Sequence, residues 1–222
     1  MNSARSATDL RETYVSLKND VVELSVFAAA DWNSNRRLDW LRGVHAENPI
    51  QELVTCRVDG FGNIIPSRPG DAKKRNSRLR PRITAKHDDE QPEIAILPNR
   101  GICRVRMDST VVFPVSNFSH ELLWCFDSWH AAQAASQAIG TANQLLYEVG
   151  GLSIPGTTPE MLANQCARIG IGGIVAPHDE WSKGLVSLCQ RFELAAFASG
   201  VGLERSFDAV RTCGISGVLV ET

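Results

Sequence analysis

Charged side chains interrupt a stretch that otherwise has the composition of buried sheet, "PEIAILPNRGICRVRMDST" at residues 92–110. Three of them, Glu93, Arg106 and Asp108, are of types that could take part in chemistry. Carboxylates such as those of Glu93 and Asp108 bind divalent cations or transfer protons. Side chains two residues apart on a strand point to the same face, so Arg106 and Asp108 would lie together. These charges therefore either face water or line a site.

The elements around this stretch follow from hydrophobic periodicity. Both apolar halves are β-rich and "PNRG" between them has turn residues, which predicts a hairpin of strands at 92–97 and 102–113. Apolar residues at helical spacing then predict a long helix over 117–139. A strand at 144–150, a helix at 157–170 and a strand at 171–177 come next, and the helix has Thr158 as its cap and Pro159 at its first position.

This order of strand, strand, long helix, strand, helix and strand resembles the core of the PD-(D/E)XK, or restriction-endonuclease-like, superfamily. Pro92-Glu93 stands where the family has a Pro-Asp pair, and Arg106-Met107-Asp108 stands where it has a Glu-x-Lys triplet. "SNFSHELLWCFDSWHAAQAASQAIG" is similar to the family's long helix, and "CARIGIGGIVAP" to its closing helix–strand unit. The resemblance rests more on order and spacing than on identities, and it covers less than half of the chain.

The resemblance implies a site in which two carboxylates hold Mg²⁺ and a lysine orients the attacking water. Arg106 departs from that pattern, because a guanidinium is always cationic and repels a metal. The implied site is therefore a remnant that no longer cuts, made of Glu93, Arg106 and Asp108. Of the three, Glu93 is the one that could ligate a metal. No cofactor is expected, and Mg²⁺ would bind only if the site were active.

The expected fold is α/β, with a mixed central sheet flanked by helices. It has a restriction-endonuclease-like core, a helical N-terminal segment and a C-terminal βα extension. The expected segments are a helical N-terminal part at 1–57, a basic Gly/Pro-rich loop at 58–88, the α/β core at 89–177, and a βα extension of the same domain at 178–222. Helical spacing of apolar residues over 6–26, and a helical reading of 27–45, support the first of these segments.

Basic residues are concentrated in one part of a chain whose net charge is −2. Residues 66–86 hold eight lysines and arginines against the single acid Asp71, and such a segment can neutralise phosphates. The alternative is a solvated loop whose charges keep it in water. The residues expected to contact nucleic acid are Lys73, Lys74, Arg75, Arg78, Arg80 and Arg82.

The leading prediction is therefore a nucleic-acid-associated protein with a degenerate nuclease core. One alternative is a non-catalytic protein-interaction or scaffold subunit that docks a protein partner through the charged loop. A further alternative is a small-molecule enzyme of (βα)-barrel type, because the helix–strand units over 161–222 resemble the closing quarter of such a barrel. Its ligands would lie near His178 and the loop after Val220.

Composition sets the remaining expectations. With 43% hydrophobic and 22% charged residues the chain is globular, and it has no apolar run long enough to cross a bilayer. The start lacks the apolar core of a signal peptide, so a cytoplasmic protein with no membrane partner is expected. The six cysteines are widely spaced without a C-x-x-C pair, so most are expected to be small buried hydrophobes. Oligomeric state is not indicated.

Overall fold

The computed structural model describes residues 24–58, 64–66, 100–106, 122–139, 144–152 and 155–221, and one sheet runs through them. Its strands are β1 (Ser25–Ala28), β2 (Ile50–Val58), β3 (Ile64–Pro66), β4 (Gly101–Arg106), β5 (Leu122–Phe126), β6 (Leu145–Glu148), β7 (Gly173–Pro177), β8 (Ala195–Val201) and β9 (Gly217–Val220).

Eight of these strands close into a parallel barrel. The sheet order is β1-β9-β8-β7-β6-β5-β4-β2, and β1 also pairs with β2, which joins the two ends of the ring. Every pairing within the ring is parallel, and β3 is added outside it as an antiparallel partner of β2. The fold is therefore a (βα)-barrel of eight parallel strands, of the TIM-barrel type.

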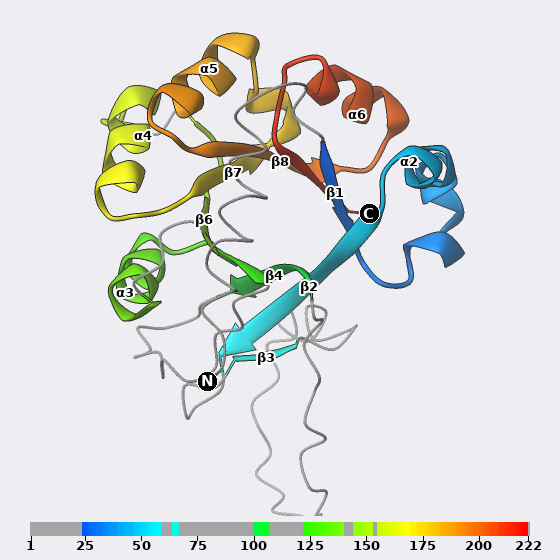
Figure 1. Cartoon of the computed structure of the whole chain (residues 1–222), viewed down its shortest axis with the longest axis horizontal. Coiled ribbons are helices and arrows are strands. Elements are labelled where there is room, and N and C mark those ends of the chain that lie inside the picture. Colours follow the sequence, from blue (N-terminus) through cyan, green and yellow to red (C-terminus); the bar gives the residue numbers. More distant parts are fainter. Residues whose placement is uncertain are drawn as a thin grey trace, which may run out of the picture.

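The described helices lie around the outside of the ring and connect β1 to β2 and each of β5 to β8 to the strand that follows it (Figure 1). Parallel neighbours need such crossover connections, since a tight turn can join only antiparallel strands. The described α-helices are α2 (Leu41–Glu47), α3 (Trp129–Ile139), α4 (Pro159–Arg168), α5 (Lys183–Arg191) and α6 (Glu204–Arg211), and the single-turn 3₁₀ helices are η2 (Trp32–Ser34), η3 (Arg36–Leu38) and η7 (His178–Glu180).

The strands bury both of their faces, and two apolar layers result. The outer layer lies between sheet and helices and includes Trp124 and Phe126 of β5. The inner layer fills the barrel with Phe27, Ile102, Cys125, Leu146, Val175, Ala195, Phe197 and Leu219. Space inside is tight at Gly217, where an added Cβ would lie 2.5 Å from the ring of Phe197. Side chains alternate between the layers because successive residues of a strand point to opposite faces.

The mixed sheet and the restriction-endonuclease-like core predicted from the sequence are wrong. β4 has parallel neighbours on both edges, β2 and β5, so residues 102–106 have no free edge for a hairpin with residues 92–97. The predicted helix over 117–139 is also wrong in part, because residues 122–126 form β5 and α3 begins at Trp129. The run "LLWCF" is apolar on both faces, which suits a strand buried between two layers as well as one turn of a buried helix.

The expected helix over 27–45 also differs from the structure. Residues 25–28 form the barrel strand β1, and only the later part of the range is helical, as η2, η3 and the start of α2. β1 is four residues long and enters the ring between β9 and β2. Such a short strand is too brief for its alternation to be recognised next to the charged residues that follow it. The predicted helix over 6–26 lies almost wholly outside the described residues.

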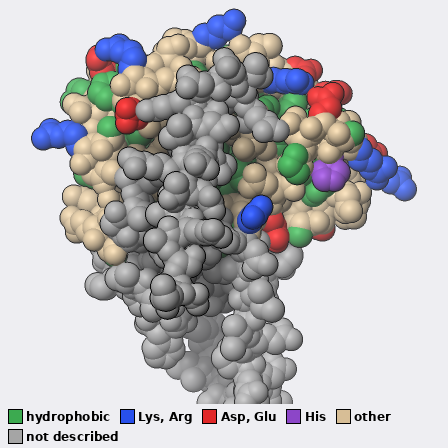
Figure 2. Space-filling model, viewed as in Figure 1, with side chains coloured by type: hydrophobic (Ala, Val, Ile, Leu, Met, Phe, Trp, Pro, Cys, Tyr) green, Lys and Arg blue, Asp and Glu red, His purple; other side chains and the backbone are tan. Residues whose placement is uncertain are grey.

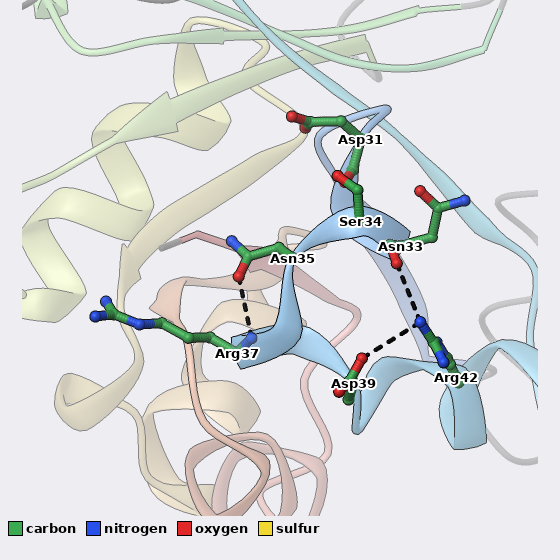
Figure 3. Close-up of polar contacts among 7 residues, drawn as sticks. All are labelled: Asp31, Asn33, Ser34, Asn35, Arg37, Asp39 and Arg42. Atoms are coloured by element: carbon green, nitrogen blue, oxygen red, sulfur yellow. Dashed lines mark hydrogen bonds and ion pairs between the residues drawn. The ribbon is translucent and has the colours of Figure 1, made fainter.

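Local polar contacts order the connection that follows β1 (Figure 3). The side chain of Asn35 accepts a hydrogen bond from the backbone N–H of Arg37 at 3.0 Å and so caps η3. Arg42 Nη2 donates to the carbonyl oxygen of Asn33 at 3.2 Å and lies 3.4 Å from Asp39 Oδ1. These contacts are exposed and hold the connection together by its own side chains.

The second half of the chain follows the sequence prediction closely. Helix α4 begins at Pro159, and the hydroxyl of its N-cap residue Thr158 accepts a hydrogen bond from the N–H of Met161 at 3.2 Å. Strands β6 and β7 lie within the stretches predicted as strands, and α5, β8, α6 and β9 follow in the alternating order expected of the βα extension at 178–222. No helix among the described residues has the length and apolarity needed to span a membrane.

The cysteines fall into two groups. Cys56 of β2 and Cys103 of β4 form a disulfide on the outer face of the ring. Cys125, Cys166 and Cys189 are free and buried, as the composition predicts, and Cys213 is half-buried. Burial raises the pKa of the Cys166 thiol to about 12 and that of Cys189 to about 11, so both stay protonated at neutral pH.

Candidate functional site

The described part of the barrel has a cavity at the carboxyl ends of its strands. The cavity has a volume of about 230 Å³ and is lined by Arg106, Asp127, Glu148, Val149, Gly150, Pro177 and Ser199. These residues come from the ends of five successive strands, β4 to β8, or from the residues directly after them. This mouth is where barrels of this fold carry ligand sites, because loops and strand ends converge there around a rigid ring.

Strand alternation brings charged side chains into the mouth. On β4, Ile102 belongs to the inner apolar layer, so Arg104 and Arg106, two and four residues later, point to the same side. On β6, Leu146 is inside and Glu148 follows it two residues later. The inner faces of β4 and β6 are therefore apolar in the barrel and become charged at the carboxyl end.

Arg104 is the buried centre of this charged layer. It is 3% exposed, and its guanidinium contacts two carboxylates from other strands. Nε lies 2.8 Å from Oε2 of Glu148 at the end of β6, and Nη1 pairs with Oε1 of Glu221, the residue after β9. Burial by itself would lower the pKa of Arg104, but the two carboxylates outweigh it and hold the pKa above its ordinary value. The guanidinium is therefore a permanent cation below the cavity.

Glu148 connects this ion-pair network to the cavity. Its side chain is 18% exposed, and it both lines the cavity and contacts Arg104. Burial raises the pKa of Glu148 above its ordinary value; attraction to Arg104 opposes this shift, and repulsion from Glu221 adds to it. A carboxyl group with a raised pKa can hold or release a proton closer to neutral pH than an exposed one can.

Asp127 and Cys125 lie beside Glu148. Phe126 pairs with Tyr147 in the parallel register, so the next residues of the two strands, Asp127 and Glu148, emerge side by side at the mouth. The thiol of Cys125 lies 4.0 Å from Glu148 Oε2, and burial raises the pKa of that thiol far above its ordinary value. Cys125 is therefore a neutral neighbour of the carboxylate, not a thiolate nucleophile.

The described residues of the mouth do not fit a divalent metal such as Mg²⁺. No three His, Cys, Asp or Glu side chains gather closely enough to hold one in the part of the chain that the structure describes. The two carboxylates that approach each other, Glu148 and Glu221, do so through Arg104, and a guanidinium repels a metal cation from that position. No chemical step is therefore assigned to a metal here.

Of the three residues predicted as a remnant nuclease site, Arg106 lies in the cavity wall. It is exposed at the carboxyl end of β4. Glu93 and Asp108 lie outside the described residues, so their role and a metal at Glu93 stay predictions. The same holds for the six basic residues expected to contact nucleic acid. On the face in Figure 2, the described acidic and basic side chains are interspersed and do not form one basic patch.

The barrel alternative placed ligands near His178 and after Val220, and both positions are at the mouth. His178 begins η7 directly after β7, and Glu221, which follows β9, is one of the two carboxylates on Arg104. Sequence reasoning did not single out Asp127, Glu148 or Ser199. The signal that could have identified them is a polar residue two positions after the last inward apolar residue of a strand.

Comparisons with known proteins support the fold. No family model matches the chain, and no curated protein matches its sequence. A solved structure from Agrobacterium tumefaciens, named as a glycerophosphoryl diester phosphodiesterase, is similar with a TM-score of 0.53 at 11% identity over 89% of this chain and 93% of that one. A glycerophosphodiester phosphodiesterase structure from Galdieria sulphuraria is similar with a TM-score of 0.55 at 9% identity over 91% and 95%. At these identities the likeness establishes the barrel fold and overturns the restriction-endonuclease resemblance.

Proposed function

We propose that this chain is a small-molecule enzyme of the (βα)-barrel type that hydrolyses a phosphodiester in the mouth of the barrel. The observation that carries the proposal is the convergence of Arg106, Asp127, Glu148 and Ser199 on one cavity. The names of the two similar barrels supply the substrate class. At about 230 Å³ the cavity is below the roughly 300–1,000 Å³ typical of drug-sized ligands, which favours a small head group.

Each cavity residue has a role that suits phosphodiester hydrolysis. The planar fork of Arg106 matches two phosphate oxygens, and the hydroxyl of Ser199 can donate a hydrogen bond to a third. Glu148, whose pKa is raised, serves as the acid that protonates the leaving alcohol. Asp127 on the neighbouring strand accepts a proton from the attacking water. One P–O bond forms from water and the P–O bond to the alcohol breaks. Between turnovers Asp127 releases its proton to solvent and Glu148 takes one up, which restores the starting protonation states.

The test is a hydrolysis assay on bis(4-nitrophenyl) phosphate and on a panel of glycerophosphodiesters. We expect Glu148→Gln to lower kcat by about 10²-fold or more, since general acid catalysis contributes about 10²–10⁴-fold. We expect Arg106→Gln to act mainly by raising KM. The matched control is Arg42→Gln, because Arg42 is 65% exposed and forms a surface ion pair away from the residues that line the cavity. Absence of turnover, together with absence of binding by calorimetry, would overturn the proposal.

A second function, phosphodiester binding without hydrolysis, is favoured by one observation. The carboxylate of Glu148 is held 2.8 Å from Arg104 Nε, and this contact favours its ionised form over the protonated acid that catalysis needs. Measurable binding that depends on Arg106 and produces no alcohol at any pH between 5 and 9 would select this function over the first.

A further inference from the structure

We infer that Arg104 is a built-in cation that replaces a divalent metal in the barrel mouth, so that ligands are bound there without metal. The inference begins with the position of the guanidinium. Arg104 comes from β4, and its two carboxylate partners come from the ends of β6 and β9, so the cation links three separate strands. Two carboxylates brought together from different strands would repel each other unless a positive charge lay between them.

The charge of Arg104 is fixed in sign and in place. The side chain is 4% exposed, and the carboxylates keep it protonated throughout the physiological pH range. A metal ion would have to displace or approach this guanidinium to reach both Glu148 and Glu221. The electrostatic repulsion between the two cations is weakly screened at a buried position. Arg104 therefore excludes a metal from the position that its two carboxylate partners would otherwise offer.

The guanidinium also retains an unused hydrogen-bond donor. Nη2 of Arg104 is buried and has no hydrogen-bond partner among the described residues, although buried donors in folded proteins are nearly always satisfied. Glu148, which contacts the same guanidinium, lines the cavity, and Arg106 lies two residues further along the same strand face. Arg104 does not itself line the cavity, so its positive charge acts on a ligand through Glu148, and Nη2 can donate a hydrogen bond only to a ligand oxygen that enters below Arg106. For the ligand class, a phosphodiester, this step rests on the proposed function.

Metal binding tests the inference without any activity assay. The electron paramagnetic resonance signal of free Mn²⁺ is measured while Mn²⁺ is titrated into each of four proteins. These are the wild type, Glu148→Gln, Arg104→Ser, and the double variant Arg104→Ser with Glu148→Gln. We expect no Mn²⁺ site in the wild type that depends on Glu148. Removal of the guanidinium in Arg104→Ser should uncover one site, with Mn²⁺ affinity raised by about tenfold or more, and Glu148→Gln should remove it again. Arg42→Ser is the matched control and should leave Mn²⁺ binding unchanged.

Two results of the Mn²⁺ measurements would overturn the inference. One is a Mn²⁺ site in the wild type that Glu148→Gln abolishes, and the other is a folded Arg104→Ser variant that gains no site. If Arg104→Ser does not fold, the comparison of Mn²⁺ binding between the wild type and Glu148→Gln still tests the inference, since both proteins keep Arg104. The failure of the proposed function is separate: it would appear as absence of phosphodiester binding, whether EDTA or Mn²⁺ is present. Phosphodiester binding that EDTA abolishes and Mn²⁺ restores would overturn the inference while supporting the proposed function.

Discussion

Replacing Arg104 by Met should strongly destabilise the fold at neutral pH. Methionine keeps the apolar stem of the side chain in place and removes only the guanidinium. Two partly buried carboxylates, Glu148 and Glu221, then remain without their cation. Truncating one partner of a buried ion pair costs about 3–5 kcal/mol because the other charge stays buried and uncompensated. The side chain of Glu221 is 35% exposed and so is partly screened by water, which places the expected loss near the lower end, about 3 kcal/mol.

The loss of unfolding free energy in Arg104→Met should depend on pH, because the carboxylates left without a cation can take up protons. The pKa of Glu148 is raised in the folded protein, so the folded state binds this proton more tightly than the unfolded chain does. The free energy of unfolding therefore falls as pH rises from the ordinary glutamate pKa through the raised one. Without Arg104 the folded pKa rises further, because the attraction that opposes the shift is gone. The difference between variant and wild type should be largest near pH 7 and should shrink toward pH 5.

Equilibrium urea unfolding at pH 7 and pH 5 measures both effects. A loss of about 3 kcal/mol corresponds to a fall in melting temperature of about 6–12 °C for a chain of this size. The matched control is Arg42→Met, which breaks an ion pair whose side chains are 65% and 56% exposed and should cost less than about 1 kcal/mol. Replacing Glu148 and Glu221 by glutamine together with Arg104→Met should recover much of the loss. The reasoning would be refuted if Arg104→Met lost no more unfolding free energy than Arg42→Met, or if its loss were larger at pH 5 than at pH 7.

Three further predictions concern the rest of the barrel. Of the four free thiols only Cys213 should react quickly with Ellman's reagent at pH 8 in the native protein, because the other three are buried, and fast reaction of more than one would contradict this. Thr158→Ala should cost about 1 kcal/mol by urea unfolding because α4 loses its N-cap, while Thr158→Ser keeps the oxygen and should cost much less. Gly217→Ala should lower the free energy of unfolding by about 1–3 kcal/mol, because the new methyl group meets the ring of Phe197 inside the barrel. Gly43→Ala in α2, where the methyl group meets nothing within 4 Å, should be neutral or stabilising, and equal effects of the two substitutions would contradict this.

The sequence predicts the second half of the barrel better than the first for a physical reason. From Thr158 onward each helix is amphipathic, two of the three have a capping side chain, and the strands between them are short apolar runs. Such units are recognised locally. Earlier in the chain, β1 is four residues long and β5 is apolar on both faces, so neither shows the alternation that would identify it as a strand. The pairing of β1 with β9, which closes the ring, joins residues about 190 positions apart in the chain, and no local pattern reveals it.

The site shows the same limit. Arg106, predicted from the sequence as part of a remnant nuclease site, lies in the cavity wall. Its expected companions, Glu93 and Asp108, were named from the motif spacing of the restriction-endonuclease resemblance, and both lie outside the described residues. Among the described residues, the carboxylates that contact β4, through Arg104, are Glu148 and Glu221, which are more than 40 and 110 residues from Arg106. Parallel barrels assemble a site from strands that are far apart in sequence, so short spacings predict which positions face inward but not which of them meet.

Arg104 connects the stability of the barrel with its proposed ligand site. A guanidinium buried in the barrel needs carboxylates to keep it there, and those carboxylates need the guanidinium because they would otherwise be partly buried charges without a partner. The network therefore stabilises the closed barrel and also belongs to the charged layer at its mouth. If the proposed function holds, we expect a substitution at Arg104 to change stability and ligand binding together, whereas one at Arg106, which is exposed, should change ligand binding with little effect on stability. Comparing substitutions at Arg104 and Arg106, which both lie on β4, thus distinguishes the residues at the mouth that stabilise the fold from those proposed to contact a ligand.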